Sequence, residues 1–295
     1  MDGRYGMKVA VITDSNSGFT QETAKASGVF CIDMPVIIDG KDYIQGVNLT
    51  TEYFYECLTG GKAVTTSQPA PGVVMKMWDD VLNLGYDEIV YIPMSSELSM
   101  SCSTAKMLAE EYDGKVEVVD NHRISVTMMQ SVFDALKMVE KGYSAGKIRE
   151  RLEETAFDSS IYIAVDTLEY LKKGGRITAA GAALGTALGI KPILTIQGGK
   201  LDAFAKVRGI KKCESKIINA MKNDIETRFA GYKKDELIIF TAGTLITEEE
   251  EHLWKSSVQE AFPDMKVIYY PLPLSIGVHI GPGSMAVALA RAVNE

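Results

Sequence analysis

The feature that most constrains the fold is a series of short apolar runs, rich in β-branched residues, separated by stretches with helical periodicity. Seven runs are predicted to be strands: residues 7–13, 29–38, 88–93, 116–119, 161–165, 236–240 and 266–270. Strands that are apolar along their whole length, and not only at every second position, are typical of parallel sheets covered by helices on both faces. The pattern therefore predicts an α/β protein.

The helical stretches carry boundary signals at their ends. Pro71 stands at the start of one apolar stripe and Gly85 at its end, while Gly142 follows another stripe. Thr247 and Glu250 have the spacing of a capping box, in which each side chain pairs with the backbone N–H of the other residue. Proline in a first turn and glycine after a last turn are typical helix limits. These signals predict helices between the strands.

The chain is long enough for two domains, because its 295 residues exceed what one compact core usually holds. One region carries a denser mixture of elements than the rest. It reads as a short helix over 167–175, a helix of small residues over 179–187, and a hairpin that turns at Gly198 and Gly199. This change indicates that a second, more mixed domain begins shortly before it.

We therefore predict a domain boundary within residues 157–160. Residues 1–159 are expected to form an open, mostly parallel sheet with helices on both faces, and residues 160–295 a mixed α+β domain. A last helix after residue 283 could pack back on the cleft. Since no long or proline-rich linker separates the two parts, we expect them to touch and to bind a ligand at their junction.

Composition and charge exclude several classes of protein. Lysine and arginine number 31 against 39 acidic residues, giving a net charge of −8 without a basic block, so nucleic acid is not expected as a partner. No apolar run approaches the roughly 20 residues that cross a bilayer, so no transmembrane segment is expected. The four cysteines lack zinc-site spacing and indicate buried or idle thiols of a cytoplasmic protein. No metal is predicted.

Two familiar motifs are excluded by their context. The GYSAG segment at 142–146 fits the pattern of a nucleophile elbow, which requires a strand before the serine and a helix after it. Here one helix ends at Gly142 and the next begins at Ser144, so this serine is predicted to be an N-cap. No phosphate-binding glycine loop follows the first strand, and nucleotide binding is not indicated.

Two segments rich in hydroxyl groups stand at predicted helix starts, one after the strand at 88–93 and one before the helix that begins at Pro71. Their polar residues are Ser95, Ser96, Ser99, Ser101, Ser103 and Thr104 in the first, and Thr65, Thr66, Ser67 and Gln68 in the second. Capping needs one or two such side chains. The excess, at the carboxyl edge of an open α/β sheet, predicts a shared site that donates hydrogen bonds to an acceptor-only group.

His279 differs from the other two histidines because small and apolar residues surround it. A lone histidine in such surroundings can be a core residue that has found its hydrogen bonds. The glycines at Gly281 and Gly283, before what is predicted to be a helix start, also allow the close approach of an anion. Together with the hydroxyl segments, and without a cluster of acids, His279 suggests a receptor for a small anion such as a carboxylate.

Two other functions could use the same residues. Ser95 or Ser96 with His279 could be the nucleophile and base of an acyl-ester hydrolase. The same donors could also hold a different small acidic metabolite. A narrow apolar tunnel beside the site would favour a lipid.

Several motifs in consistent order resemble the DegV family of bacterial fatty-acid-binding proteins. They run from about residue 8 to 290 and read TDSNSG, TSQPAP, SSELS, VDTLEYLKKGGRI, IKPIL, KVRG and GVHIGPG. The resemblance implies a two-domain protein that holds one long-chain fatty acid, with its carboxyl group at the domain junction and its acyl chain in an apolar tunnel. It also implies a non-catalytic carrier without a cofactor, which presents the acid to a separate ATP-dependent fatty acid kinase subunit in phospholipid metabolism.

The resemblance also implies which residues hold the carboxyl group. These are Thr66, Ser95, Ser96, Ser99 and His279, with Arg176 and Gly281 near the site or on the surface that meets the kinase. Asp14 and Ser15 match family positions to which we assign no role.

The chain departs from the family pattern at four positions. Glu97 and Met100 stand where glycine is usual, Ser101 stands where threonine is usual, and Ile280 stands where threonine is common. An acid beside a bound carboxylate is unfavourable unless it points outward. An altered head-group site and ligand preference are therefore expected.

Overall fold

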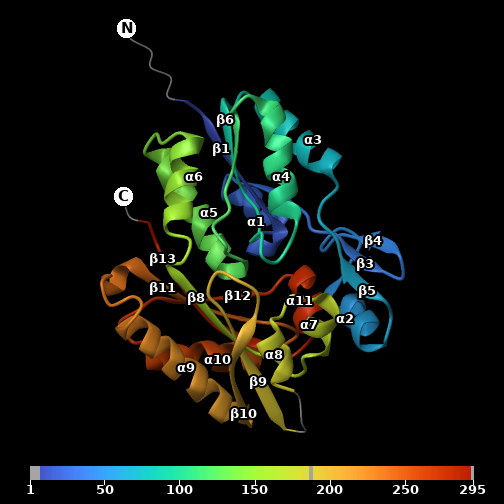
Figure 1. Ribbon diagram of the computed structural model, residues 1–295, viewed down its shortest axis with the longest axis vertical. Helices are drawn as coiled ribbons and strands as arrows, with labels where there is room; N and C mark the ends of the chain where they lie inside the picture. The colour runs from blue at the N-terminus through green and yellow to red at the C-terminus, as the bar shows by residue number, and fades with distance from the viewer. Residues whose placement is uncertain (1–6, 186–188, 294–295) are drawn as a thin grey trace.

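The computed structural model describes residues 7–185 and 189–293. These residues form three β-sheets with helices packed around them. Figure 1 shows the four-stranded sheet in the upper part of the molecule, the six-stranded sheet in the lower part and the three-stranded sheet at one side. The predicted fold class, α/β with a mostly parallel N-terminal sheet and a mixed α+β C-terminal part, is confirmed.

The four-stranded sheet is parallel throughout, in the order β2-β1-β6-β7. Its strands are β1 (Val9–Asp14), β2 (Phe30–Ile32), β6 (Glu88–Ile92) and β7 (Val116–Val118). One face packs against helices α3 (Pro71–Asn83) and α4 (Ser101–Ala109), and the other against α1 (Gln21–Ala26), α5 (Ser125–Glu140) and α6 (Ala145–Glu154). The strands are apolar on both faces because helices bury both faces, as predicted.

The GYSAG segment joins two helices. Ser144 caps α6 by accepting a hydrogen bond from the Lys147 N–H, and Gly142, just after α5, has a left-handed φ of 80°. Glycine adopts this conformation without the steric cost that a side chain would add. The segment is therefore a turn between helices, as predicted, and not a nucleophile elbow.

Helix limits elsewhere also follow their sequence signals. Pro71 is the first residue of α3. The side chains and backbone N–H groups of Thr247 and Glu250 pair as a capping box at the start of α10 (Glu248–Ala261). These local signals were sufficient because the capping box pairs backbone N–H groups that a first turn leaves without partners, and proline has no such N–H to pair.

The six-stranded sheet is mixed, in the order β10-β9-β8-β13-β11-β12. Its strands are β8 (Ser159–Ala164), β9 (Ile190–Ile196), β10 (Asp202–Arg208), β11 (Leu237–Gly243), β12 (Val267–Pro271) and β13 (Met285–Arg291). Strands β9 and β10 form the predicted hairpin. One face packs against α9 (Ile210–Glu226) and α10, while the other shares a core with the N-terminal sheet and α5.

The segment after residue 283 is a strand, so the predicted last helix is wrong. Strand β13 lies inside the sheet, antiparallel to both β8 and β11. Ala286 and Ala288 face the N-terminal sheet, whereas Val287 and Leu289 face α9 and α10, which is the alternation of a strand. Alanine has the highest helix propensity, but pairing along both edges of the strand overrides that preference.

The three-stranded sheet interrupts a run that was predicted as one strand. Residues 29–38 form β2 and, after Pro35, the separate strand β3 (Val36–Ile38), which pairs with β4 (Lys41–Tyr43) and β5 (Val64–Thr66). Proline lacks the N–H that a continuous ladder needs. This sheet and α2 (Thr51–Thr59) pack against α11 (Leu274–Ile280), so a segment from early in the chain contributes to the C-terminal side of the molecule.

Two short helices, α7 (Glu169–Gly174) and α8 (Ala179–Ala183), lie between β8 and β9 as predicted. Residues 186 and 187, the end of the predicted small-residue helix, lie outside the described residues. The four cysteines are free and buried, in line with the prediction. Within the described ranges, no helix combines the length and apolar character that a bilayer crossing requires.

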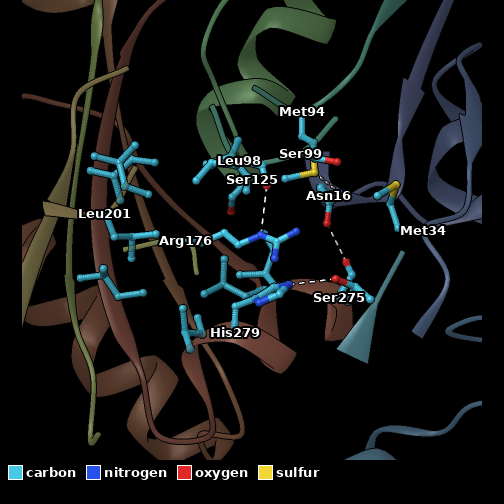
Figure 2. Close-up of a pocket in the computed structure, with 18 of the residues that line it drawn as sticks. Asn16, Met34, Met94, Leu98, Ser99, Ser125, Arg176, Leu201, Ser275 and His279 are labelled. Atoms are coloured by element: carbon cyan, nitrogen blue, oxygen red, sulfur yellow. Dashed lines mark hydrogen bonds between the residues drawn. The ribbon is translucent and has the colours of Figure 1, made fainter. Parts of the chain in front are cut away.

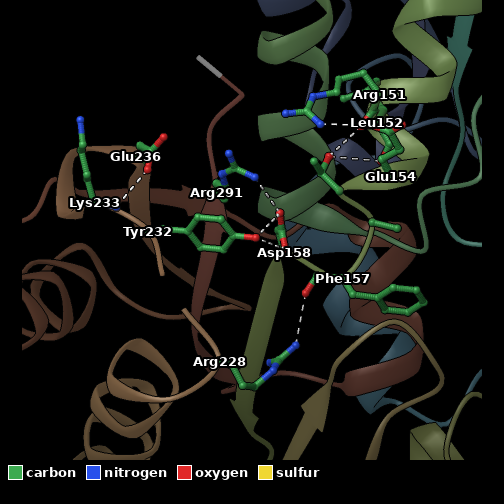
Figure 3. Close-up of polar contacts among 12 residues, drawn as sticks. Arg151, Leu152, Glu154, Phe157, Asp158, Arg228, Tyr232, Lys233, Glu236 and Arg291 are labelled. Atoms are coloured by element: carbon green, nitrogen blue, oxygen red, sulfur yellow. Dashed lines mark hydrogen bonds and ion pairs between the residues drawn. The ribbon is translucent and has the colours of Figure 1, made fainter. Parts of the chain in front are cut away.

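The crossover into the six-stranded sheet is fixed by polar contacts (Figure 3). The Asp158 carboxylate accepts hydrogen bonds from the Tyr232 hydroxyl at 3.1 Å and from Arg291 Nη1 at 3.2 Å, and Arg228 donates to the Phe157 carbonyl at 3.2 Å. Every strand of the six-stranded sheet begins at residue 159 or later. The domain boundary within 157–160 stays a prediction.

Candidate functional site

A cavity of about 410 Å³ lies where the inner face of the six-stranded sheet meets the N-terminal elements. Its volume falls in the range typical of small-molecule sites, about 300–1,000 Å³. The walls come from β5, the loop before α4, the start of α5, the sheet and α11. The cavity therefore collects residues from distant parts of the chain.

Most of the wall is aliphatic. The sheet contributes Ile161, Ile163, Ala242, Ala286 and Ala288, and three methionines, Met34, Met94 and Met100, line the N-terminal side. Among the described residues that line the cavity, none is phenylalanine, tyrosine or tryptophan. Unbranched methionine side chains adapt to ligands of varied shape, so this wall suits a flexible aliphatic group.

Polar side chains gather at one end of the cavity. Thr66 is the last residue of β5 and His279 lies in the last turn of α11, and the Thr66 Oγ1 lies 2.9 Å from the His279 Nε2. Gly174, at the end of α7, lies so close that a Cβ built on it would overlap the imidazole. Gly174 of the KKGGR segment thus lets α7 approach His279 directly.

The surroundings of His279 keep its imidazole neutral. Burial lowers its pKa from 6.5 to about 4, and the positive charge of Arg176 acts in the same direction. In the part of the chain that the structure describes, Nδ1 has no hydrogen-bond partner. In the neutral tautomer that carries its proton on Nε2, the imidazole donates to the Thr66 hydroxyl, and the hydroxyl can then donate its own proton to a ligand.

Arg176 is the one charged side chain among the described residues that line the cavity. Its Nε donates to the Leu98 carbonyl at 3.1 Å and its Nη1 to the Gly174 carbonyl. No carboxylate of the described residues forms an ion pair with it. Figure 2 shows Arg176 between Leu201 on one side and Asn16 and Ser275 on the other, at the border of the apolar and polar parts of the cavity.

A second polar pair, Asn16 and Ser275, completes this end. The Ser275 hydroxyl donates to the Asn16 Oδ1 at 2.7 Å, which ties α11 to the turn after β1 (Figure 2). The buried Asp14 carboxylate holds that turn by accepting from the backbone N–H groups of Asn16 at 2.9 Å and Met94 at 2.8 Å. Burial raises the Asp14 pKa to about 6, and these two hydrogen bonds oppose the shift.

Comparison with known proteins identifies the family. Residues 8–292 match the family model described as "Uncharacterised protein, DegV family". The chain belongs to the DegV family. It is 32% identical over 285 residues to a DegV domain-containing protein of Deinococcus radiodurans, covering 96% of this chain and 98% of that one. A DegV domain-containing protein of Caldanaerobacter subterraneus is 31% identical, with 95% and 98% covered.

Solved DegV structures share the whole fold. A DegV family protein from Thermus thermophilus, described for its fatty acid binding, superposes with a TM-score of 0.86 at 28% identity, covering 97% of this chain and 100% of that one. DegV of Bacillus subtilis, described as a fatty acid binding protein, gives a TM-score of 0.82 at 25% identity, with 97% and 99% covered. The two-part architecture is therefore that of DegV proteins.

The structure brings together some of the residues that the DegV resemblance implied and leaves others outside. Thr66, Ser99, Arg176 and His279 line the cavity. Gly281 is not among the lining residues; with a left-handed φ of 74°, it gives the Tyr170 ring room to pack on α11. Its place in the H-x-G-P-G motif has this packing reason.

Ser95 and Ser96 are not among the residues that line the cavity. Ser95 is buried and its Oγ accepts from the Glu97 N–H at 3.2 Å, while the Ser96 N–H turns to the Asp120 carboxylate at 3.3 Å. The histidine is paired with Thr66 and not with either serine. The geometry thus gives no support to a hydrolase built from Ser95 or Ser96 with His279.

The departures from the DegV pattern have separate outcomes. Glu97 is exposed and is not among the lining residues, so its charge points away from the cavity, the outward placement that a nearby carboxylate site requires. Met100 lines the cavity although its side chain is 68% exposed, so it stands at the rim. Ile280 also lines the cavity and adds apolar surface where threonine would add a donor.

Asn16, Ser125 and Ser275 line the cavity although the sequence did not assign them to the site, whereas Ser67 and Gln68, which belong to the predicted donor segment, line it as expected. Asn16 lies in the TDSNSG segment and Gln68 in TTSQPAP, both of which were singled out. Ser125 and Ser275 carried no signal, because a single serine among apolar residues is not distinguishable from a structural one.

Proposed function

We propose that this DegV protein binds one long-chain fatty acid, with the carboxylate at Arg176, Thr66 and His279 and the acyl chain along the aliphatic walls. One observation carries the proposal: an aliphatic cavity that holds a single half-buried cation without a carboxylate partner among the described residues. Its hydrogen bonds to the Leu98 and Gly174 carbonyls leave the positive charge itself without a counter-ion. A monovalent anion with a long apolar tail satisfies both parts of the cavity at once.

The energy of binding would come mainly from the tail. An acyl chain with about 14 methylenes gains about 0.8 kcal/mol for each one buried, on the order of 11 kcal/mol before the costs of association and ordering. The carboxylate then needs only to replace its hydrogen bonds to water. The Arg176 guanidinium and the hydroxyls of Thr66 and Ser99 are donors of the required kind.

The composition of the wall supports an aliphatic acid over other small acids. An aromatic acid would be expected to meet the rings of phenylalanine, tyrosine or tryptophan, and no described lining residue is of these types. A small polar metabolite would leave most of the aliphatic wall facing water. A fatty acid avoids both problems.

Membership of the DegV family supports a wider role for the same site. We infer that the protein is a non-catalytic carrier in the cytoplasm, which presents the carboxyl group to a separate ATP-dependent kinase that forms acyl phosphate for phospholipid metabolism. Ser95, Ser96 and Gly281, which do not line the cavity, would act in this role by shaping the loops around it. The kinase step is tested by mixing palmitate-loaded protein with a fatty acid kinase subunit and ATP and measuring acyl phosphate.

Ligand binding itself is tested by native mass spectrometry of gently purified protein, followed by delipidation and titration with palmitate and oleate. The proposal predicts one bound fatty acid per chain before delipidation and saturable binding of one equivalent after it. Protein that is empty after purification and stays empty in the titration would refute it. Labelling of a serine by a fluorophosphonate probe would favour the hydrolase instead.

A further inference from the structure

Strand β13 presents only alanine to the cavity side of the sheet. Along its inner face stand Ala286, Ala288 and Ala290, while the opposite face carries the larger Val287 and Leu289 under α9 and α10. On the neighbouring strand β8, the inner face carries the larger Ile161 and Ile163. The alanines therefore leave a furrow along β13.

The strand register fixes how far each alanine lies from the polar end. Ala286 pairs with Ala242 on one side and Ile163 on the other, and Ala288 is in register with Ile161. Ala286 and the residues paired with it lie next to the end of β11. There the Gly243 carbonyl accepts a hydrogen bond from the N–H of Leu272, which lies just before α11, the helix that carries His279. Ala288 lies two residues further along, roughly 7 Å deeper.

The furrow has an end. Ala286 and Ala288 line the cavity, but Ala290, the next inward residue, is fully buried and is not among the lining residues. Beside Ala288, on β11, stands Phe240, which is also buried outside the cavity lining. The part of β13 that lines the cavity therefore extends from Ala286 to Ala288 and ends there.

We propose that the alanines of β13 set the length of acyl chain that this protein accepts, with Ala286 beneath the middle of the chain and Ala288 beneath its terminal part. This inference rests on the proposed function. A side chain added at 288 would occupy only the space of the last methylenes, whereas one added at 286 would block the furrow closer to the head group. Each methylene kept out of the cavity weakens binding about fourfold.

The test compares Ala288→Leu and Ala286→Leu by calorimetric titration of delipidated protein with laurate, myristate, palmitate and stearate. We expect Ala288→Leu to weaken stearate and palmitate by tenfold or more while laurate changes less than about threefold. We expect Ala286→Leu to weaken all four acids, laurate included. Val287→Ile, on the opposite face of the same strand, is the matched control and should leave the affinity series unchanged.

Thermal melting of each variant checks folding, and Ala288→Val and Ala286→Val replace the leucine variants if those do not fold. The proposal is overturned if substitution at 288 weakens laurate as much as stearate, or if the two positions give the same dependence on chain length. Failure of the unmodified protein to bind any of the four acids is a different result. It would contradict the proposed function itself, and the chain-length proposal with it.

Discussion

The hydroxyl of Thr66 and the imidazole of His279 lie 2.9 Å apart although 213 positions separate them in the chain. Thr66 ends an edge strand of the small sheet and His279 lies in the last turn of α11, which packs against that sheet. The contact therefore exists only when early and late parts of the chain are folded together. The polar end of the cavity therefore forms only when the tertiary structure forms.

Replacing Arg176 should separate recognition of the charge from recognition of the tail. Arg176→Met removes the one charged side chain among the described lining residues and should weaken palmitate binding by about 1.5–3 kcal/mol, roughly 10- to 150-fold. Binding of the neutral analogue hexadecanol should change little. Calorimetric titration measures both, and Arg208→Met, at an exposed position on β10, is the matched control. An equal loss for acid and alcohol would contradict the role of Arg176.

Removing the Thr66 hydroxyl should destabilise the empty protein. Thr66→Val keeps the shape of the side chain but leaves the His279 Nε2 without its partner, at an expected cost of about 1–3 kcal/mol in the free energy of unfolding. Thr66→Ser keeps the hydroxyl and should cost less. Urea denaturation compares the unmodified protein with Thr66→Val and Thr66→Ser. Equal denaturation midpoints for the two variants would show that the hydrogen bond between Thr66 and His279 does not contribute to stability.

A methyl group at Gly174 should disturb the site through His279. A Cβ there overlaps the imidazole, so Gly174→Ala should displace the ring and weaken palmitate binding. Gly72→Ala in α3 is the control, because its Cβ would meet no atom within 4 Å and alanine favours a helix by up to about 1 kcal/mol. Titration with palmitate and thermal melting check both variants. Unchanged affinity in Gly174→Ala would mean that the imidazole position is not critical.

His279 should make the empty protein less stable in mild acid. Its pKa is 6.5 when unfolded but about 4 when folded, so between these values the unfolded state binds more protons. The free energy of unfolding should therefore fall as pH falls from 6.5 towards 4, and the fall should be smaller in His279→Gln. Asp14, whose folded pKa of about 6 exceeds 3.8, contributes with the opposite sign but equally to both proteins. If the free energies of unfolding of the unmodified protein and of His279→Gln, measured by urea denaturation, change in parallel with pH, the lowered pKa is not that of His279.

The sequence predicted helix limits and buried strands correctly where a single residue or a short run of neighbours determines them. Pro71, Ser144 and Gly142 mark helix limits in the structure as they do in the sequence. The uniformly apolar runs of β1 and β6 correctly indicated a sheet buried on both faces. Such features depend on a few neighbouring residues, which a sequence displays directly.

Features that depend on contacts between distant parts of the chain were harder to predict from the sequence. The MAVALAR run of β13 has the composition of a helix, and only its position between β8 and β11 makes it a strand. Ser95 and Ser96 belong to the hydroxyl segment that was singled out, yet the turn directs their hydrogen bonds to Glu97 and Asp120. Ser275 faces the cavity because its helix packs on the small sheet, and no local pattern indicates that.

The most direct test of the central claim is a crystal structure of the protein saturated with palmitate. The account predicts one elongated ligand whose carboxylate lies within hydrogen-bond distance of Arg176 and the Thr66 hydroxyl, and whose chain runs along β13 over Ala286 towards Ala288. A ligand with its carboxylate at the opposite end of the cavity, or bound elsewhere on the protein, would contradict it.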